Sequence, residues 1–250
     1  MTTLQAQALL LAAGRGERMR PLTDVTPKPL LAVQGKPLLQ WPMEALQRAG
    51  VPDALINTAW LGAQIEARFG AVHELAGHAP LRLHYSHEGV DFGRALETAG
   101  GIVRALPRLA DTFWVAAGDV HAPDFVFDAA VLARFQASRA LAHLWLVPNP
   151  AHNPRGDFGL SEAGWALNLP KDTDQTRYTF STLALYKRAF FDAPWCPLPP
   201  GNPQGVAAPL APMLRAGMDN GVVSASLYPG AWTDVGTPER LAELNKDTSP

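Results

Sequence analysis

The stretch LLLAAGRGERMRPL, residues 9–22, joins an apolar run to a turn that carries two glycines and three arginines. Apolar runs of this length are typical of a strand that is buried on both faces of a sheet. Gly14 and Gly16 free the backbone after the strand, so that its N–H groups can approach a ligand closely. Arg15, Arg18 and Arg20 add positive charge, which indicates that this ligand is an anion.

The glycine spacing of this stretch fits neither of two familiar phosphate-binding loops. A P-loop closes with a Lys-Ser/Thr pair, and residues 9–22 contain none. The dinucleotide-binding fingerprint needs a third glycine where this chain has Met19, and a long helix that Pro21 blocks. Taken alone, the stretch therefore also fits an ordinary tight turn between a strand and a helix, and the rest of the chain has to decide.

The composition is that of an ordinary globular protein of 250 residues, 47% of them hydrophobic and 18% charged. The formal net charge of −2 gives no electrostatic footprint for nucleic acid or for an anionic membrane surface. No apolar stretch is long enough to span a bilayer, and the N-terminus lacks the basic start of a signal peptide. The single cysteine, Cys196, excludes an internal disulfide. We therefore expect a cytoplasmic protein that binds neither nucleic acid nor membrane.

Strand-like and helix-like patterns alternate through the first half of the chain. The expected strands are 7–12, 54–58, 81–85, 113–117 and 141–147, and the expected helices are 38–49, 61–69, 97–107 and 126–137. This alternation predicts an α/β fold whose mostly parallel sheet carries helices on both faces. Later segments indicate short antiparallel strands after about residue 150, a long loop at 193–205, a helix near 206–217, a strand near 222–228 and a final helix from Pro238.

Lys28 lies between two prolines in the segment TPKPL, which follows the glycine turn. The prolines hold the backbone extended and stop the segment from becoming a helix. Most surface lysines are solvated charges, but a lysine in a rigid apolar segment beside an anion-binding turn is poorly explained in that way. We therefore expect Lys28 to contact phosphate.

Two aspartates follow strand-like segments at positions that suit a metal ion. Asp119 ends the segment WVAAGD, and Asp234 lies in WTDVGT before the final helix. Either residue alone is as consistent with a turn or a helix cap. Together with an anion-binding turn, however, they match Mg²⁺, which proteins hold with one or two carboxylates plus substrate phosphates and water.

These elements predict phosphoryl-group chemistry that depends on Mg²⁺. Cations and backbone donors would hold a triphosphate, and the metal would bridge its oxygens. A second substrate that is itself a phosphate is already ionised near neutral pH, so neither an enzyme nucleophile nor a general base is required. The histidines are scattered without metal-ligand spacing, and zinc is therefore not expected.

Four ordered motifs resemble the sugar-1-phosphate nucleotidylyltransferase family. LAAGRGERMRPLT with TPKPLL is similar to the signature loop and its downstream lysine, and ETAGGI at 97–102, Gly-Asp at 118–119 and WTDVGTPERL at 232–241 follow in the family's order. The resemblance spans almost the whole chain and implies a Rossmann-like α/β fold. It also implies a single nucleotidyltransferase domain over 1–250, with a nucleotide-binding half at 1–147 and a sugar-binding half at 148–250.

The resemblance implies a role for individual residues as well. Arg18, Lys28 and Asp119 would be catalytic, and Asp119 and Asp234 would hold Mg²⁺. Glu97 and Asp157 would contact the sugar, although Asp157 also fits a turn position after Gly156. The residues implied to bind the nucleotide are Ala12, Ala13, Gly14, Gly16, Glu17, Arg18, Lys28, Gly100 and Gly101.

Segments 56–70 and 149–160 are similar to one branch of the family, which transfers a uridylyl group from UTP to N-acetylmuramic acid 1-phosphate in peptidoglycan recycling. This similarity implies UTP and a sugar 1-phosphate as substrates, and a UDP-sugar and pyrophosphate as products. The chain departs from the branch at Ala117, at Thr182 in place of a glycine, and in a longer segment at 89–96.

These departures leave open another member of the family, such as a mannose- or heptose-1-phosphate guanylyltransferase. A regulator that binds nucleotide sugars without turnover is disfavoured, because Arg18, Lys28 and both aspartates are present. The composition does not distinguish a monomer from a small homo-oligomer.

Overall fold

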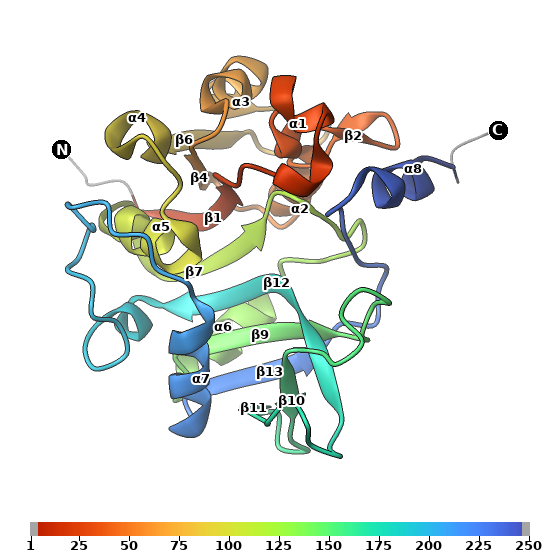
Figure 1. The fold of residues 1–250 in the computed structure, drawn as a ribbon. Helices are drawn as coiled ribbons and strands as arrows, with labels where there is room; N and C mark the ends of the chain where they lie inside the picture. The colour runs from red at the N-terminus through yellow and green to blue at the C-terminus, as the bar shows by residue number, and fades with distance from the viewer. Residues whose placement is uncertain (1–4, 247–250) are drawn as a thin grey trace.

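A ten-stranded sheet organises residues 5–246, the part of the chain that this computed structural model describes. Its strands run in the order β11-β10-β12-β7-β1-β4-β6-β5, and β9 and β13 extend it beside β12 (Figure 1). The strands are β1 (Ala6–Ala12), β4 (Asp53–Thr58), β5 (Val72–His73), β6 (Leu81–His87), β7 (Leu109–Ala117), β9 (Ala142–Val147), β10 (Phe158–Leu160), β11 (Ala166–Leu167), β12 (Arg177–Lys187) and β13 (Val223–Leu227). Two separate ribbons pair β2 (Ala32–Val33) with β3 (Lys36–Pro37) and β8 (Val120–His121) with β14 (Thr233–Asp234).

Strands β7, β1, β4 and β6 form the parallel part of the sheet, because β1 pairs in parallel with β4 and β7, and β4 with β6. The edge strand β5 pairs antiparallel with β6. β12 then runs antiparallel to β7 and β9, and β10 and β11 continue this antiparallel part. β13 returns parallel to β9. The predicted α/β fold with a mostly parallel central sheet is confirmed, as are the short antiparallel strands after residue 150. The expected division of the domain at residues 147 and 148 stays a prediction, and its ends at 1–4 and 247–250 lie outside the described residues.

Helices cover both faces of the sheet. Successive side chains of β1 point to opposite faces, and each face packs against its own set of helices. Leu9 belongs to the buried cluster that includes α5 (Glu97–Ala105) and α7 (Ala211–Asp219). Leu10 belongs to a second cluster, with α2 (Gln40–Arg48), α3 (Gly62–Phe69) and α6 (Ala129–Ala137). The other helical segments are η1 (Glu17–Met19), α1 (Leu22–Val25), η2 (Lys28–Leu30), α4 (Glu88–Phe92), η3 (Leu106–Arg108), η4 (Arg188–Phe191) and α8 (Pro238–Lys246). Among the described residues, no helix is both long enough and apolar enough to cross a membrane.

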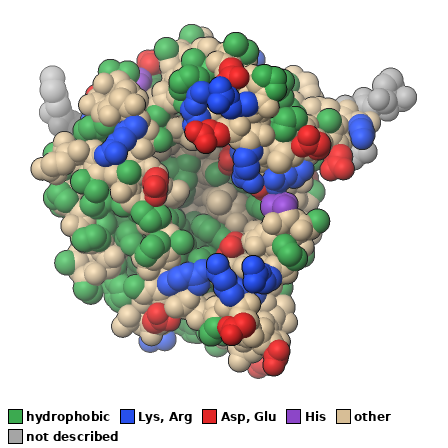
Figure 2. Space-filling model, in the orientation of Figure 1, with side chains coloured by type: hydrophobic (Ala, Val, Ile, Leu, Met, Phe, Trp, Pro, Cys, Tyr) green, Lys and Arg blue, Asp and Glu red, His purple; other side chains and the backbone are tan. Residues whose placement is uncertain are grey.

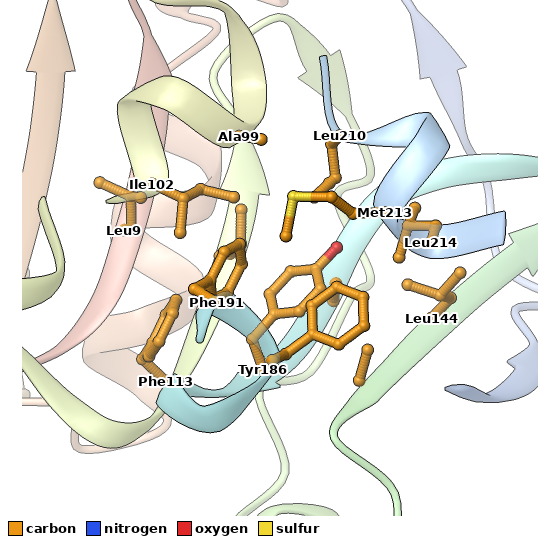
Figure 3. Packing of buried hydrophobic residues seen from close by; sticks show 14 of the residues in the cluster. Leu9, Ala99, Ile102, Phe113, Leu144, Tyr186, Phe191, Leu210, Met213 and Leu214 are labelled. Atoms are coloured by element: carbon orange, nitrogen blue, oxygen red, sulfur yellow. The ribbon is translucent and has the colours of Figure 1, made fainter. Parts of the chain in front are cut away.

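Aromatic side chains fill the core between the sheet and the helices α5 and α7. Figure 3 shows Phe113, Tyr186 and Phe191 together with Ile102 and Met213. The ring centroids of Tyr186 and Phe191 lie 5.4 Å apart, and those of Phe113 and Phe191 lie 6.1 Å apart. These distances are in the range of favourable aromatic pairs. The packing fixes α5 and α7 on the same face of the sheet.

A smaller apolar cluster ties the C-terminal helix to the glycine turn. Met19 and Val235 are both fully buried in it, and Leu244 of α8 packs against them. The backbone N–H of Val235 also donates to the carbonyl oxygen of Asp119, at 3.0 Å. The last sequence motif is thereby held next to the first one and next to the Gly-Asp pair.

The helix predicted at 126–137 begins three residues later, at Ala129. The Asp128 side chain accepts a hydrogen bond from the N–H of Ala130 at 2.7 Å, which is the geometry of a helix cap. The apolar residues before the cap made the helical pattern look longer than it is. Phe127 is buried among aromatic side chains instead of lying on the helix.

The helix predicted at 206–217 is α7, which begins at Ala211. The side chain of Asn202 explains the delay, because it accepts from the N–H of Val206 at 2.9 Å and donates to the Gly100 carbonyl at 3.2 Å. These bonds hold the chain irregular ahead of α7. Segment 193–205 contains no helix or strand, as the long loop predicted there requires.

Candidate active site

A cavity of about 640 Å³ opens at the carboxyl ends of β1, β4 and β7. Figure 2 shows a hollow on this face, with Lys and Arg side chains gathered along its upper and lower margins. Ligands of open α/β sheets bind at such strand ends. Several of the predicted site residues line the cavity, namely Ala12, Ala13, Gly14, Lys28, Glu97, Asp119 and Asp157.

The glycine turn after β1 is braced by side chains from other elements. The N–H of Ala12 donates to Oδ1 of Asn57 at 2.8 Å, and the hydroxyl of Thr23 donates to the Gly16 carbonyl at 2.8 Å. Gly16 has φ +68°, and a Cβ added there would lie only 3.1 Å from Thr23 and 3.2 Å from Lys28. A larger residue would therefore be strained at this position. Gly14 has nothing within 4 Å of the position of a Cβ, which leaves its backbone open to the cavity.

The three arginines of the turn do not act as one cluster. Arg15 stacks on Trp60, with 3.3 Å from its guanidinium carbon to the ring centroid, and Arg15 and Arg20 both pair with Asp24. Arg18 instead approaches the C-terminal motif, since its Nη2 lies 3.2 Å from the position that a Cβ would take on Gly236. Arg18, Gly16 and Glu17 do not themselves line the cavity.

Lys28 is buried at the cavity wall, with only 8% of its surface exposed. Its Nζ donates to Oδ2 of Asp119 at 2.5 Å. The segment around it differs from the prediction in one respect. Pro27 is extended, as expected, but residues 28–30 form the short 3-10 helix η2, because the prolines block an α-helix without blocking a single turn.

Asp234 lies beside Asp119 in the fold but does not line the cavity. It pairs with Val120 across the β8–β14 ribbon, so it is one residue out of register with Asp119. Its carboxylate accepts from Nη1 of Arg240 and lies 2.9 Å from Nε2 of His152. Both aspartates thus contact a cationic group of the chain.

The donor set at this point fits a hard divalent cation. The carboxylates of Asp119 and Asp234 come from adjacent strand ends, and each pairs with a basic side chain of the protein. Their negative charges would likewise attract a metal cation. Among residues 5–246, no group of three or more His, Cys, Asp or Glu side chains could hold a metal by itself. A cation held by Asp119 and Asp234 would therefore need further ligands from substrate phosphates and water, as Mg²⁺ commonly does.

The opposite wall of the cavity comes from β10, β12 and α7. Asp157 accepts from the N–H of Phe180 at 2.9 Å and from the Asn153 side chain at 3.2 Å, so its carboxylate also supports the local turn. Thr182 has φ +64°, a conformation that a β-branched residue rarely adopts. It lies where β12 shifts register against β9, between Phe180 and Ala184. The difference from the glycine seen in the resembling branch thus falls on a strained residue of the cavity wall.

Glu97 and the two glycines that follow it have different surroundings. Glu97 begins α5 with φ +56° and lines the cavity. A Cβ on Gly100 would lie 2.5 Å from the Val206 carbonyl, and one on Gly101 would lie 2.6 Å from the Glu88 carboxylate. Helix packing therefore requires both glycines, and neither lines the cavity. Their predicted approach to the nucleoside stays a prediction.

The sequence does not indicate a buried row of hydrogen-bonded polar groups that lies behind the glycine turn. Asn57 lines the cavity, and its Nδ2 donates to Oε1 of Glu88 at 2.7 Å. Oε2 of Glu88 accepts from the N–H of Leu96 at 2.8 Å, just before Glu97. Burial raises the pKa of Glu88, which is fully buried. These hydrogen bonds link Ala12 to the start of α5. The only sign of them in the sequence is an Asn at the end of the buried strand LINT.

Sequence comparisons relate this protein to known nucleotidyl transferases. The profile of the family described as nucleotidyl transferase matches residues 7–177. The N-acetylmuramate alpha-1-phosphate uridylyltransferase of Neisseria meningitidis serogroup B is 44% identical over 243 residues, which cover 95% of this chain and 96% of that protein. The mannose-1-phosphate guanylyltransferase of Mycobacterium tuberculosis is 31% identical, over 99% of this chain and 66% of that protein.

A solved structure of a Bacillus anthracis protein, described as a glucose-1-phosphate thymidylyltransferase in complex with sucrose, superposes with a TM-score of 0.74. The superposition covers 96% of this chain and 94% of the Bacillus anthracis chain. The two sequences are 19% identical, so the likeness supports the fold alone. The family match over more than half of the sequence goes further than the fold. The chain belongs to the nucleotidyl transferase family.

Proposed function

We propose that this protein transfers a uridylyl group from UTP to N-acetylmuramic acid 1-phosphate, giving UDP-N-acetylmuramic acid and pyrophosphate. The observation that carries the proposal is the relative from Neisseria meningitidis, whose name states this activity and which matches 95% of this chain at 44% identity. The cavity supports it, because Lys28 and Asp119 meet at one wall and Asp157 lies on the opposite wall of the same cavity.

The proposed reaction needs no nucleophile from the protein. A phosphate oxygen of the sugar 1-phosphate forms a bond to the α-phosphorus of UTP. The bond from that phosphorus to the oxygen bridging the α- and β-phosphates breaks, and pyrophosphate leaves with the electron pair. The attacking phosphate is already ionised near neutral pH, so no side chain has to remove a proton from it.

The basic residues would stabilise charge that develops during this step. Lys28 would contact the α-phosphate or the departing pyrophosphate, and its burial supports a fixed position. Arg18 would act beside it from the glycine turn. The backbone of Ala12, Ala13, Gly14 and Gly16 would approach the phosphates, with Glu17 at the end of the turn. Gly100 and Gly101 of α5 would approach the nucleoside.

Asp119 and Asp234 would hold Mg²⁺, and Lys28, Arg240 and His152 would then have to exchange their present carboxylate contacts for others. When bound, the metal would neutralise phosphate charge and orient the two reacting groups. Glu97 and Asp157 would contact the sugar from opposite walls of the cavity. The cytoplasmic location and the oligomeric state stay predictions.

One other member of the family has support from a specific observation. The mannose-1-phosphate guanylyltransferase of Mycobacterium tuberculosis matches nearly the whole chain, although at lower identity. A regulator without turnover is disfavoured by the presence of Arg18, Lys28, Asp119 and Asp234 together.

A screen of pyrophosphate release separates these alternatives. Four nucleoside triphosphates are crossed with the 1-phosphates of N-acetylmuramic acid, N-acetylglucosamine, glucose, mannose and a heptose. The proposal predicts the highest kcat/KM for UTP with N-acetylmuramic acid 1-phosphate. A preference for GTP with mannose 1-phosphate would move the assignment to the alternative, and no turnover with any pair would support the regulator.

A further inference from the structure

Arg215 lies on the cavity wall that β10, β12 and α7 form, and it has no role in the function proposed above. It comes from the middle of α7 and is half-buried, with Leu214 of the same helix beside it on the cavity wall. Its guanidinium carbon lies 5.1 Å from the centroid of the Phe158 ring, which also lines the cavity. The aromatic ring and the helix therefore hold the guanidinium at the wall of the site.

The guanidinium of Arg215 donates a hydrogen bond to the side-chain amide of Asn168 and not to a carboxylate. Its Nη1 donates to Oδ1 of Asn168 at 2.7 Å, and Nδ2 of Asn168 donates to both carboxylate oxygens of Asp219 at 3.0 Å. Asn168 thus stands between the cation and the nearest acid of this network. Within residues 5–246, Arg215 has no carboxylate partner at ion-pair distance. Its remaining N–H groups stay able to bind an anion.

The other acid on this wall is already engaged. Both carboxylate oxygens of Asp157 accept hydrogen bonds, from Phe180 N and from Asn153. The arginine is therefore not positioned as the partner of a protein carboxylate. The half-buried guanidinium lies on a wall lined with Leu210, Leu214 and Phe158. Because burying an unpaired charge is unfavourable, a ligand with a negative charge would bind well beside it.

The sugar of the proposed substrate supplies such a charge. N-acetylmuramic acid differs from N-acetylglucosamine by a lactyl ether on O3, which carries a carboxylate that is ionised at neutral pH. The 1-phosphate of the same molecule belongs at the Lys28 and Asp119 end of the cavity. The substrate thus needs a second cation away from the phosphate end, and a planar guanidinium binds a carboxylate with two parallel hydrogen bonds.

We propose that Arg215 binds the lactyl carboxylate and thereby selects N-acetylmuramic acid 1-phosphate over N-acetylglucosamine 1-phosphate. Asn168 and Phe158 orient the guanidinium for this contact. The inference rests on the proposed function, since it takes the substrate from it, and it adds the residue that distinguishes the two sugars.

The test measures kcat/KM for both sugar 1-phosphates, with UTP, in the wild type, Arg215→Gln and Arg215→Lys. The wild type should prefer the muramic acid substrate. Arg215→Gln should lower the ratio of the two kcat/KM values by about tenfold to hundredfold, as expected for loss of a hydrogen bond to a charged group. Arg215→Lys keeps the charge and should retain part of the preference. Because the ratio is taken within one preparation, it does not depend on how much of a variant is folded.

Arg139→Gln is the matched control, because Arg139 also lies over an aromatic ring, 4.6 Å from the centroid of Trp165, but is exposed and outside the cavity. It should leave the ratio at the wild-type value. An unchanged ratio in Arg215→Gln would overturn the role of Arg215 while leaving the proposed function intact. A wild type that prefers N-acetylglucosamine 1-phosphate, or uses neither sugar, would overturn the proposed function and this inference with it.

Discussion

Lys28 and Asp119, which are 91 positions apart in the sequence, form an ion pair with 2.5 Å between Nζ and Oδ2. The pair joins the first motif of the chain to the middle one at the cavity wall. One of its members is predicted to contact phosphate and the other to hold a metal ion. The proposed function therefore requires the pair to open when substrate and metal bind, with the lysine moving its contact from carboxylate to phosphate.

Replacing Lys28 should slow the chemical step. A fixed cation next to the charge that develops on the phosphates stabilises the transition state more than the ground state. Lys28→Ala and Lys28→Gln should each lower kcat by roughly a hundredfold or more at saturating substrates. The exposed Lys171 provides the control, and Lys171→Ala should behave as the wild type. Near-normal turnover in both Lys28 variants, with intact circular dichroism, would show that Lys28 is not a phosphate ligand.

Removal of either proposed metal ligand should abolish most of the activity. Asp119→Asn and Asp234→Asn keep the shape of the side chain but lose the charge that attracts Mg²⁺. Mg²⁺ titration of turnover, together with Mn²⁺ binding followed by electron paramagnetic resonance, measures the effect separately on catalysis and on the metal. Asp111→Asn is a suitable control, since that side chain is 98% exposed. Turnover of the wild type that survives EDTA would contradict the metal requirement.

Thr182→Gly should stabilise the fold, in contrast to most glycine substitutions in strands. Thr182 has φ +64°, which a β-branched residue adopts only with strain, whereas glycine adopts it freely. Relief of the strain should raise the free energy of unfolding by about 1 kcal/mol. Thr112→Gly, at a position of β7 that pairs in register with Lys187 of β12, should instead lower it. Urea unfolding of both variants makes the comparison, and a destabilised Thr182→Gly would argue against strain at this position.

The stability of the fold should fall in mild acid because of His143. Burial lowers the pKa of His143 to about 4, and its Nδ1 lies 2.9 Å from the Ser224 hydroxyl. Between pH 6.5 and about 4 the unfolded chain binds this proton and the folded chain does not, so the free energy of unfolding decreases as the pH falls. The loss from this residue should be on the order of 2–3 kcal/mol.

His143→Gln should flatten this part of the stability curve, measured by urea unfolding at a series of pH values. His78→Gln, at an exposed position, should leave the curve unchanged. A wild-type curve with the same slope as that of His143→Gln would mean that His143 titrates alike in the folded and unfolded chains.

The fold and the meeting of Lys28 with Asp119 at the cavity were predictable because the residues concerned lie in short local motifs. An apolar run followed by Gly14 and Gly16 specifies a strand and an open turn through backbone sterics alone. Lys28 and Asp119 were placed by the rule that ligands bind at strand carboxyl ends. The helix starts at Ala129 and Ala211 were missed, because a cap and a buried amide decided them.

The residues that the sequence did not reveal act through contacts between distant segments. Asn57 and Glu88 become a buried chain only when β4, α4 and the turn before α5 are packed together. Arg215 reads as an ordinary surface residue of an amphipathic helix until β10 brings Phe158 beneath it. Tertiary packing creates these relationships, and no local spacing encodes them.

The product of one reaction decides whether the protein has the proposed activity. The purified protein is incubated with UTP, N-acetylmuramic acid 1-phosphate and Mg²⁺, and the nucleotide products are identified by mass spectrometry while pyrophosphate is measured in parallel. The proposed function predicts UDP-N-acetylmuramic acid and pyrophosphate in equal amounts, with a higher kcat/KM than for any other pair of nucleoside triphosphate and sugar 1-phosphate. Absence of UDP-N-acetylmuramic acid, or a higher kcat/KM for another pair, would contradict it.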